Sequence, residues 1–129
     1  MLENADVTLF NESDGKFYPT VFKGVSWRGK TQTVMSSNGL VAVKTFVIRI
    51  PEGKETKPYL PFKEWQKLTE EEKANFWTLQ NDNKDYITDS IVTSFDSFTE
   101  VCEKYNVSRI YGFADNRQGS LSHWRIDAK

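Results

Sequence analysis

The chain has few of the residues that build metal sites, disulfides or thiol nucleophiles. Among its 129 residues there is one cysteine, Cys102, and one histidine, His123. A single cysteine excludes an intrachain disulfide and a zinc site built on several thiolates, and a single histidine excludes a two-histidine metal site. The sequence therefore predicts a protein of a reducing compartment that holds no metal or other cofactor.

Long apolar runs and an excess of one charge are also missing. No apolar stretch approaches the length that spans a bilayer, and the acidic start Met1–Asp6 lacks the features of a signal peptide. Seventeen basic residues face eighteen acidic ones, which leaves a net charge of −1. Nucleic-acid-binding domains usually carry a clustered basic excess. We therefore expect no membrane partner and no specific nucleic-acid binding.

Short alternating segments between turn-forming residues dominate what is present. The clearest is 40–50, where Leu40, Ala42, Phe46, Ile48 and Ile50 occupy alternate positions before Pro51. Aromatic residues, which suit pleated surfaces, make up 14% of the chain. Further strands are expected at 7–10, 20–28, 31–35, 77–80, 85–92, 108–114 and 121–126, with turns at 28–30, 36–39, 81–84 and 115–119. The pattern predicts a mainly β fold, a small β-barrel or sandwich, in one β-rich domain over residues 1–129.

Two segments depart from this strand pattern. Residues 52–76 are rich in charge and proline and predict a long loop with a short helix, in which Thr69–Glu72 matches a capping box. Residues 97–105 predict one packed α-helix, because Ser97 and Glu100 match a second capping box. The apolar side chains of that helix recur at helical spacing, and they include Cys102.

Candidate catalytic and metal-binding groups are weak. Cys102 and His123 could form a nucleophile and base, but a thiol on the apolar stripe of a helix is a poor nucleophile. Asp82, Asp85 and Asp89 resemble a calcium loop without its glycine and terminal glutamate. We therefore predict no catalytic, cofactor-binding or metal-binding residues and no enzymatic activity. An enzyme with scattered carboxylates stays open as a lesser alternative.

A nucleic-acid alternative rests on aromatic rings that stand next to basic residues. Trp27–Lys30 and Trp124–Arg125 combine stacking and phosphate-binding groups, as on the face of a small barrel that binds single strands. The same residues also suit any amphipathic strand. Single-stranded nucleic-acid binding by a small β-barrel is therefore the alternative function.

Two residues are candidate contacts for a protein partner. Trp65 is a large ring in the long loop with no strand to bury it, so it could contact a partner or pack the loop onto the barrel. Arg117 lies in the turn Asp115–Gly119 and is the member of that turn that can reach a partner.

Several short motifs together resemble a family of small structural proteins of tailed phages and prophages. They span most of the chain: Asn4–Phe10, Gly24–Trp27, Val47–Pro51, Trp77–Gln80, Asp85–Ile87, Asp115–Ser120 and His123–Trp124. The resemblance extends to minor capsid proteins that complete the head as stopper-type head–tail connectors, which are small β-barrels with a long loop.

The resemblance implies a virion assembly protein that acts through protein contacts. Its partners would be other phage structural proteins, such as portal or tail components, and it would form a homo-oligomeric ring when docked. It would be found in the host bacterial cytoplasm during assembly, and in the virion if the phage is active. The loop at 52–76 would correspond to the long loop of the connector proteins.

Overall fold

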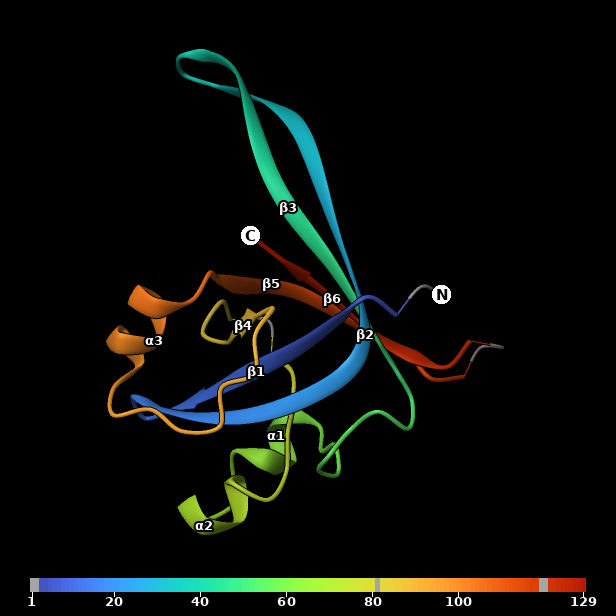
Figure 1. Ribbon diagram of the computed structural model, residues 1–129, viewed down its shortest axis with the longest axis vertical. Helices are drawn as coiled ribbons and strands as arrows, with labels where there is room; N and C mark the ends of the chain where they lie inside the picture. The colour runs from blue at the N-terminus through green and yellow to red at the C-terminus, as the bar shows by residue number, and fades with distance from the viewer. Residues whose placement is uncertain (1–2, 81, 119–120) are drawn as a thin grey trace.

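The computed structural model describes residues 3–80, 82–118 and 121–129, and it shows a barrel from which a long β-hairpin projects (Figure 1). The described strands are β1 Ala5–Ser13, β2 Lys16–Ser36, β3 Gly39–Pro51, β4 Tyr86–Thr88, β5 Val107–Asn116 and β6 His123–Ala128. They close in the order β1-β2-β3-β6-β5-β4, with every neighbouring pair antiparallel. The predicted mainly β fold is therefore confirmed, as a barrel.

A tight turn and a bulge shape the first hairpin. Asp14 and Gly15 both have positive φ, which is the conformation of a two-residue hairpin turn whose twist matches its strands. Farther along β2, the register against β1 shifts between Ala5 and Val7, and Gly24 there has φ 71°. A glycine inside a strand pattern suggests a bulge or a close backbone contact, and the structure shows the bulge. The backbone N–H of Gly24 donates to the Asp6 carboxylate at 3.0 Å, which holds the bulge in place.

The predicted turn at 28–30 is wrong, because β2 runs through it without a break. Gly29 pairs with Phe46 on β3 and does not adopt positive φ, and the Phe46 ring lies 3.7 Å from where its Cβ would be. Unbroken pairing with β3 on both sides of Gly29 therefore carries β2 through this position. The chain reverses only at 36–39, where Gly39 has φ 102°.

The predicted strand at 77–80 is also wrong. This segment, hereafter the plug, makes one isolated bridge between Trp77 and Tyr59 and places Trp77 and Leu79 in the core of the barrel. Its polar backbone is satisfied by a side chain: Asn11 donates to the Thr78 carbonyl at 2.8 Å and accepts from the Thr78 N–H at 3.2 Å. Sequence alternation alone cannot separate such a filling segment from a strand. The strand predicted at 85–92 is likewise limited to β4.

Short helices lie outside the barrel. The segment 52–76 contains α1 Phe62–Trp65 and α2 Glu70–Lys73, at the opposite end of the molecule from the projecting hairpin (Figure 1). The capping box of α2 is confirmed, with hydrogen bonds in both directions between Thr69 and Glu72. The helix predicted at 97–105 is confirmed as α3 Phe98–Lys104, with Ser97 as its N-cap.

Helix α3 presents a narrower apolar face than expected. Val101 is buried, and Phe98 packs edge-on against Phe10 and stacks on Phe17 at 3.9 Å between ring centroids. Cys102, in contrast, is exposed, so its predicted place on the apolar stripe is wrong. The helix is only seven residues long, and contact with one side of the barrel buries only a narrow strip of such a helix.

Candidate interaction surfaces

The projecting part of the β2–β3 hairpin is the most exposed element of the described chain. We call residues 28–44 the arm. Pairing of β2 with β1 ends at Val25, and pairing of β3 with β6 begins at Phe46, so in the described structure the strands of the arm pair only with each other. Figure 1 shows the arm extending well beyond the barrel. A two-stranded ribbon with two open edges is marginal in water and suited to pairing with another chain.

Two apolar cross-strand pairs lie directly beside the polar turn at 36–39, and we call these four residues the tip of the arm. Val34 pairs with Val41 and Met35 pairs with Leu40, and directly opposed residues project to the same side of a ribbon. The two pairs are adjacent, so they project to opposite sides. Met35 is 77% exposed and Leu40 is 71% exposed. Such side chains in one place on a small protein mark an interaction surface.

Trp65 does not offer a contact surface. Its ring is fully buried, edge-on to Tyr18 at 5.6 Å, and its Nε1 donates to the Lys73 carbonyl at 3.3 Å. The Lys73 ammonium lies 5.3 Å from the ring centroid and donates to Ser13 Oγ at 2.7 Å. Trp65 therefore anchors the 52–76 segment to the first hairpin. Of the two roles considered for it, contact with a partner and packing of the loop onto the barrel, the structure shows the packing role.

Arg117 covers one end of the barrel core. Its guanidinium lies 4.8 Å from the Trp124 ring and 5.1 Å from the Tyr59 ring. It also donates from Nε and Nη2 to the two carboxylate oxygens of Asp115, at 2.8 and 2.7 Å. These hydrogen bonds lower the pKa of Asp115. The side chain of Arg117 is 37% exposed, so its predicted contact with a partner remains a prediction. Gly119, in the same turn, lies outside the described residues.

An apolar groove separates the 52–76 segment from the barrel wall. Tyr59, Pro61 and Phe62 form one side, and Leu79 and Phe113 form the other. Its volume is about 450 Å³, and Lys63, Gln80 and Asp82 lie at its rim. One side of the groove is formed at α1, which lies on the opposite side of the barrel from the arm (Figure 1).

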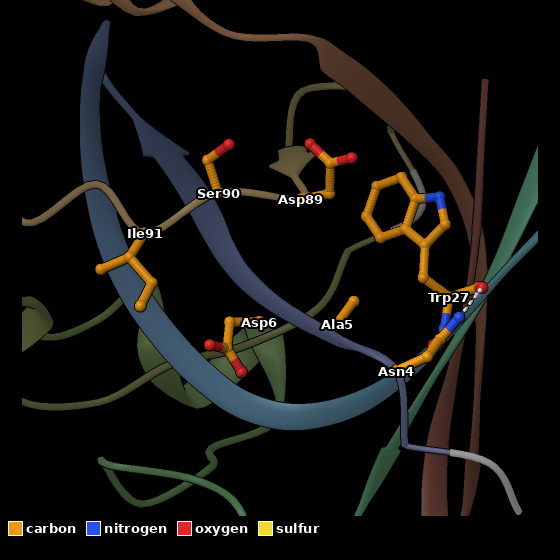
Figure 2. A pocket seen from close by; sticks show the side chains of 7 residues that line it. All are labelled: Asn4, Ala5, Asp6, Trp27, Asp89, Ser90 and Ile91. Carbon is orange, nitrogen blue, oxygen red and sulfur yellow. Dashed lines mark hydrogen bonds between the residues drawn. The ribbon is translucent and has the colours of Figure 1, made fainter.

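A second, polar hollow lies at the base of the arm, beside Trp27 (Figure 2). Asn4 fixes this region, because its side chain donates to the Trp27 carbonyl at 3.1 Å and accepts from the Trp27 N–H at 2.8 Å. The carboxylates of Asp6 and Asp89 line the hollow and come from different segments. Two carboxylates beside Trp27 oppose a polyanion there. Trp124, the other ring considered for base stacking, is buried.

Asp85 anchors the plug and is the most perturbed acid of the described chain. It accepts from Asn11 Nδ2 at 2.8 Å, from the Glu12 N–H at 3.0 Å and from Gln80 Nε2 at 2.7 Å. Burial raises the pKa of Asp85 to about 7, against the lowering effect of these three hydrogen bonds. The exposed residues Asp82 and Asp89 do not join it, and the described residues contain no group of acids, histidines or cysteines able to hold a metal ion.

Cys102 and His123, the candidate nucleophile and base, make contacts with different parts of the chain. His123 contacts the Leu121 carbonyl through Nδ1 at 2.6 Å and the Asn116 amide through Nε2 at 3.4 Å. Cys102 is exposed on α3, but partial desolvation and the neighbouring Glu103 carboxylate raise the pKa of its thiol, which disfavours the nucleophilic thiolate. Neither residue contacts the other among the interactions described. The structure thus brings no nucleophile and base together at this pair.

The arm is the surface that sequence reasoning missed. The expected turn at 28–30 split its first strand and hid a ribbon that pairs from Ser26 opposite Arg49 to Ser36 opposite Gly39. A signal was present, because the apolar pairs Val34–Met35 and Leu40–Val41 flank the turn at 36–39 symmetrically. Such symmetry around a turn indicates one continuous hairpin.

Comparisons with known proteins give one match. The family model DUF6751, described as a family of unknown function, matches residues 2–129. No curated protein and no solved structure matches the chain. Within the described residues, none of the helices has the length and apolar character needed to cross a membrane.

Proposed function

The chain belongs to DUF6751, a family of unknown function. We propose that it is a non-enzymatic assembly protein of a tailed phage or prophage. It acts at the head–tail joint, as a head-completion or connector subunit, through contacts with other structural proteins. The observation that carries this proposal is the arm. A projecting ribbon with an apolar tip and open edges serves no purpose for an isolated barrel, but it suits a subunit that docks.

A connector ring needs each subunit to present a projecting element and a surface that receives one. Closed rings arise when two different surfaces of the same chain meet head to tail. The arm lies on the opposite side of the barrel from α1, which borders the apolar groove, so the two surfaces are separate, as head-to-tail contact requires (Figure 1). The barrel between them is rigid because it is closed and well packed.

The partners follow from the same geometry. An open strand edge binds another chain through main-chain hydrogen bonds, with little demand on sequence, while apolar side chains at the tip supply affinity. The proposed partners are the portal or tail components on either side and further copies of the chain. Assembly of these parts takes place in the host bacterial cytoplasm, and the product is part of the virion.

The decisive test is electron microscopy of lysates from an induced host that lacks this gene. We expect separated tails beside filled or leaking heads, and restoration of complete particles by the wild-type gene on a plasmid. Intact virions in the deletion strain would contradict the proposal.

Point variants extend this test to the arm. Leu40→Ser removes an apolar side chain from the tip, and Leu121→Ser removes a comparably exposed leucine elsewhere on the surface. We expect the Leu121→Ser gene to restore virions and the Leu40→Ser gene to restore about tenfold fewer, since one buried apolar contact contributes about 1–2 kcal/mol to docking. Equal restoration by both genes would contradict the role of the arm.

A further inference from the structure

The tip of the arm has the form of a wedge. Val34 and Val41 cover one face, and Met35 and Leu40 cover the other. A surface that docks flat against a partner needs only one apolar face. An element with two apolar faces buries both only when it enters a groove between two walls.

The apolar groove is open to solvent and has apolar side chains on two sides. One wall is Tyr59, Pro61 and Phe62, from the 52–76 segment, and the other is Leu79 and Phe113, from the plug and β5. The volume of about 450 Å³ is in the range of clefts that bury a ligand of several side chains. Trp65 fixes the first wall through its buried ring, so the groove is pre-formed.

The net charges favour the body of a second copy over a second arm as the binding site for the arm. The arm contains Arg28, Lys30 and Lys44 and no acidic residue, so it carries a charge of +3. The whole chain carries −1, and the residues outside the arm therefore carry −4. Two arms repel each other, whereas an arm is attracted to the body of a second copy. The arm projects away from the side of the barrel that carries α1, so its tip does not reach the groove beside α1 in its own chain (Figure 1).

We infer that the tip of the arm inserts into the apolar groove of a second copy of this chain, between the 52–76 segment and β5. This inference rests on the proposed function and deepens it, because it identifies the two surfaces that join neighbouring subunits. The contact is heterologous: each copy donates one arm and receives one.

Cysteine cross-linking between two separately labelled preparations tests the contact. Both carry Cys102→Ser, which removes the exposed native thiol. The first adds Ser37→Cys, in the turn of the arm, and the second adds Lys63→Cys, at the rim of the groove. A control preparation adds Thr93→Cys, at an exposed position that does not line the groove. The mixtures are oxidised mildly over a range of protein concentrations.

We expect Ser37→Cys to cross-link to Lys63→Cys about tenfold faster than to Thr93→Cys, and Leu40→Ser in the first preparation to abolish that preference. Equal rates with the two positions, or cross-links only between two Ser37→Cys chains, would overturn the inference. Failure of Leu40→Ser to restore virions, without any groove cross-link, would also overturn it but leave the proposed function standing. Groove cross-linking together with intact virions in the deletion strain would contradict only the proposed function.

Discussion

At the scale of single residues, the barrel depends on a few polar side chains that hold the plug. Asp85 accepts three hydrogen bonds from neutral donors, and Asn11 binds both the N–H and the carbonyl of Thr78. A carboxylate in such a place is costly, since burial disfavours its charged form. The same residue that fixes the plug therefore makes the stability of the barrel sensitive to pH.

The raised pKa of Asp85 predicts a loss of stability as the pH rises. Because the folded-state pKa is about 7 and the ordinary value is 3.8, the folded protein binds the proton more tightly. The stabilisation is fully present below pH 4 and is lost as the pH rises through 7, by about 2–4 kcal/mol. Thermal melts of the wild type between pH 5 and 8 should show this decline. Asp85→Asn should flatten it, and the control Asp89→Asn, at an exposed position that does not contribute to the raised pKa of Asp85, should not. Parallel curves for all three proteins would contradict the assignment.

Replacing Arg117 should have a smaller effect on stability than replacing Asp85. It covers Trp124 and Tyr59 and binds Asp115, but it is partly exposed, so solvent screens much of the ion pair. We expect Arg117→Ala to lower the free energy of unfolding by about 1 kcal/mol in urea denaturation, mainly through lost stacking. Arg117→Lys should recover only part of this, because a lysine cannot form the two-pronged contact. An Arg117→Ala curve that overlays the wild type would disprove the stacking role.

At the scale of elements, the 52–76 segment and the arm differ in how firmly they are attached to the barrel. The segment is fastened to the first hairpin by Trp65 and Lys73, whereas the arm contacts little besides itself. The segment should therefore contribute more to the stability of the fold than the arm does. We expect stability to depend on the segment and the proposed docking to depend on the arm.

Trp65→Ala should be strongly destabilising. Deleting a fully buried indole leaves a cavity, which costs about 3–5 kcal/mol of unfolding free energy, and the 52–76 segment loses its anchor. Limited proteolysis should then cut first within 52–76, while the matched control Phe62→Ala, with a partly exposed ring, should cost less. Cleavage at unchanged rates in Trp65→Ala would show that other contacts hold the segment.

The tip of the arm should be nearly neutral for folding. Met35 and Leu40 bury little surface in the isolated chain, so replacing both with serine should change the free energy of unfolding by less than about 0.5 kcal/mol. Chemical denaturation followed by tryptophan fluorescence measures this. A large loss of stability would mean that the tip contributes to the fold of the single chain, and it would weaken the argument that it is kept for a partner.

At the scale of the whole molecule, the chain combines a closed barrel with an element that is open on both edges. Closure of the barrel satisfies its strand edges internally, and its core is filled by Trp77, Trp124 and Phe22 in edge-to-face contacts. The arm carries its open edges outward (Figure 1). The molecule thus restricts its capacity for strand pairing to one projecting ribbon.

Hydrogen exchange should reveal this division. In the isolated chain, the amides of the barrel strands should exchange slowly and those on the outer edges of the arm should exchange fast, because they bond only to water. On assembly, protection should appear in the arm and around Phe62 and Phe113, whereas the barrel should change little. An arm that is already protected in the isolated chain would contradict the open-edge description.

The sequence by itself determined the fold class and most of the local structure. Alternation gave the main strands, and the residues with special backbone or capping roles gave the turn at 36–39, the bulge at Gly24 and the helix caps at Thr69 and Ser97. These features depend on interactions within a few residues, so a linear pattern contains them.

The features that depend on contacts between distant parts of the chain could be read only from the folded structure. Pairing with β3 carried β2 through the turn expected at 28–30 and formed the arm. Hydrogen bonds with Asn11 hold the segment 77–80, which was expected to be a strand, as the plug. Only one side of α3 contacts the barrel, so Cys102 on that helix is exposed. Trp65 is buried because its ring packs against Tyr18 and its Nε1 donates to the Lys73 carbonyl. Each outcome depends on a partner distant in sequence, and the free energy of burial or hydrogen bonding between such partners outweighs local preference.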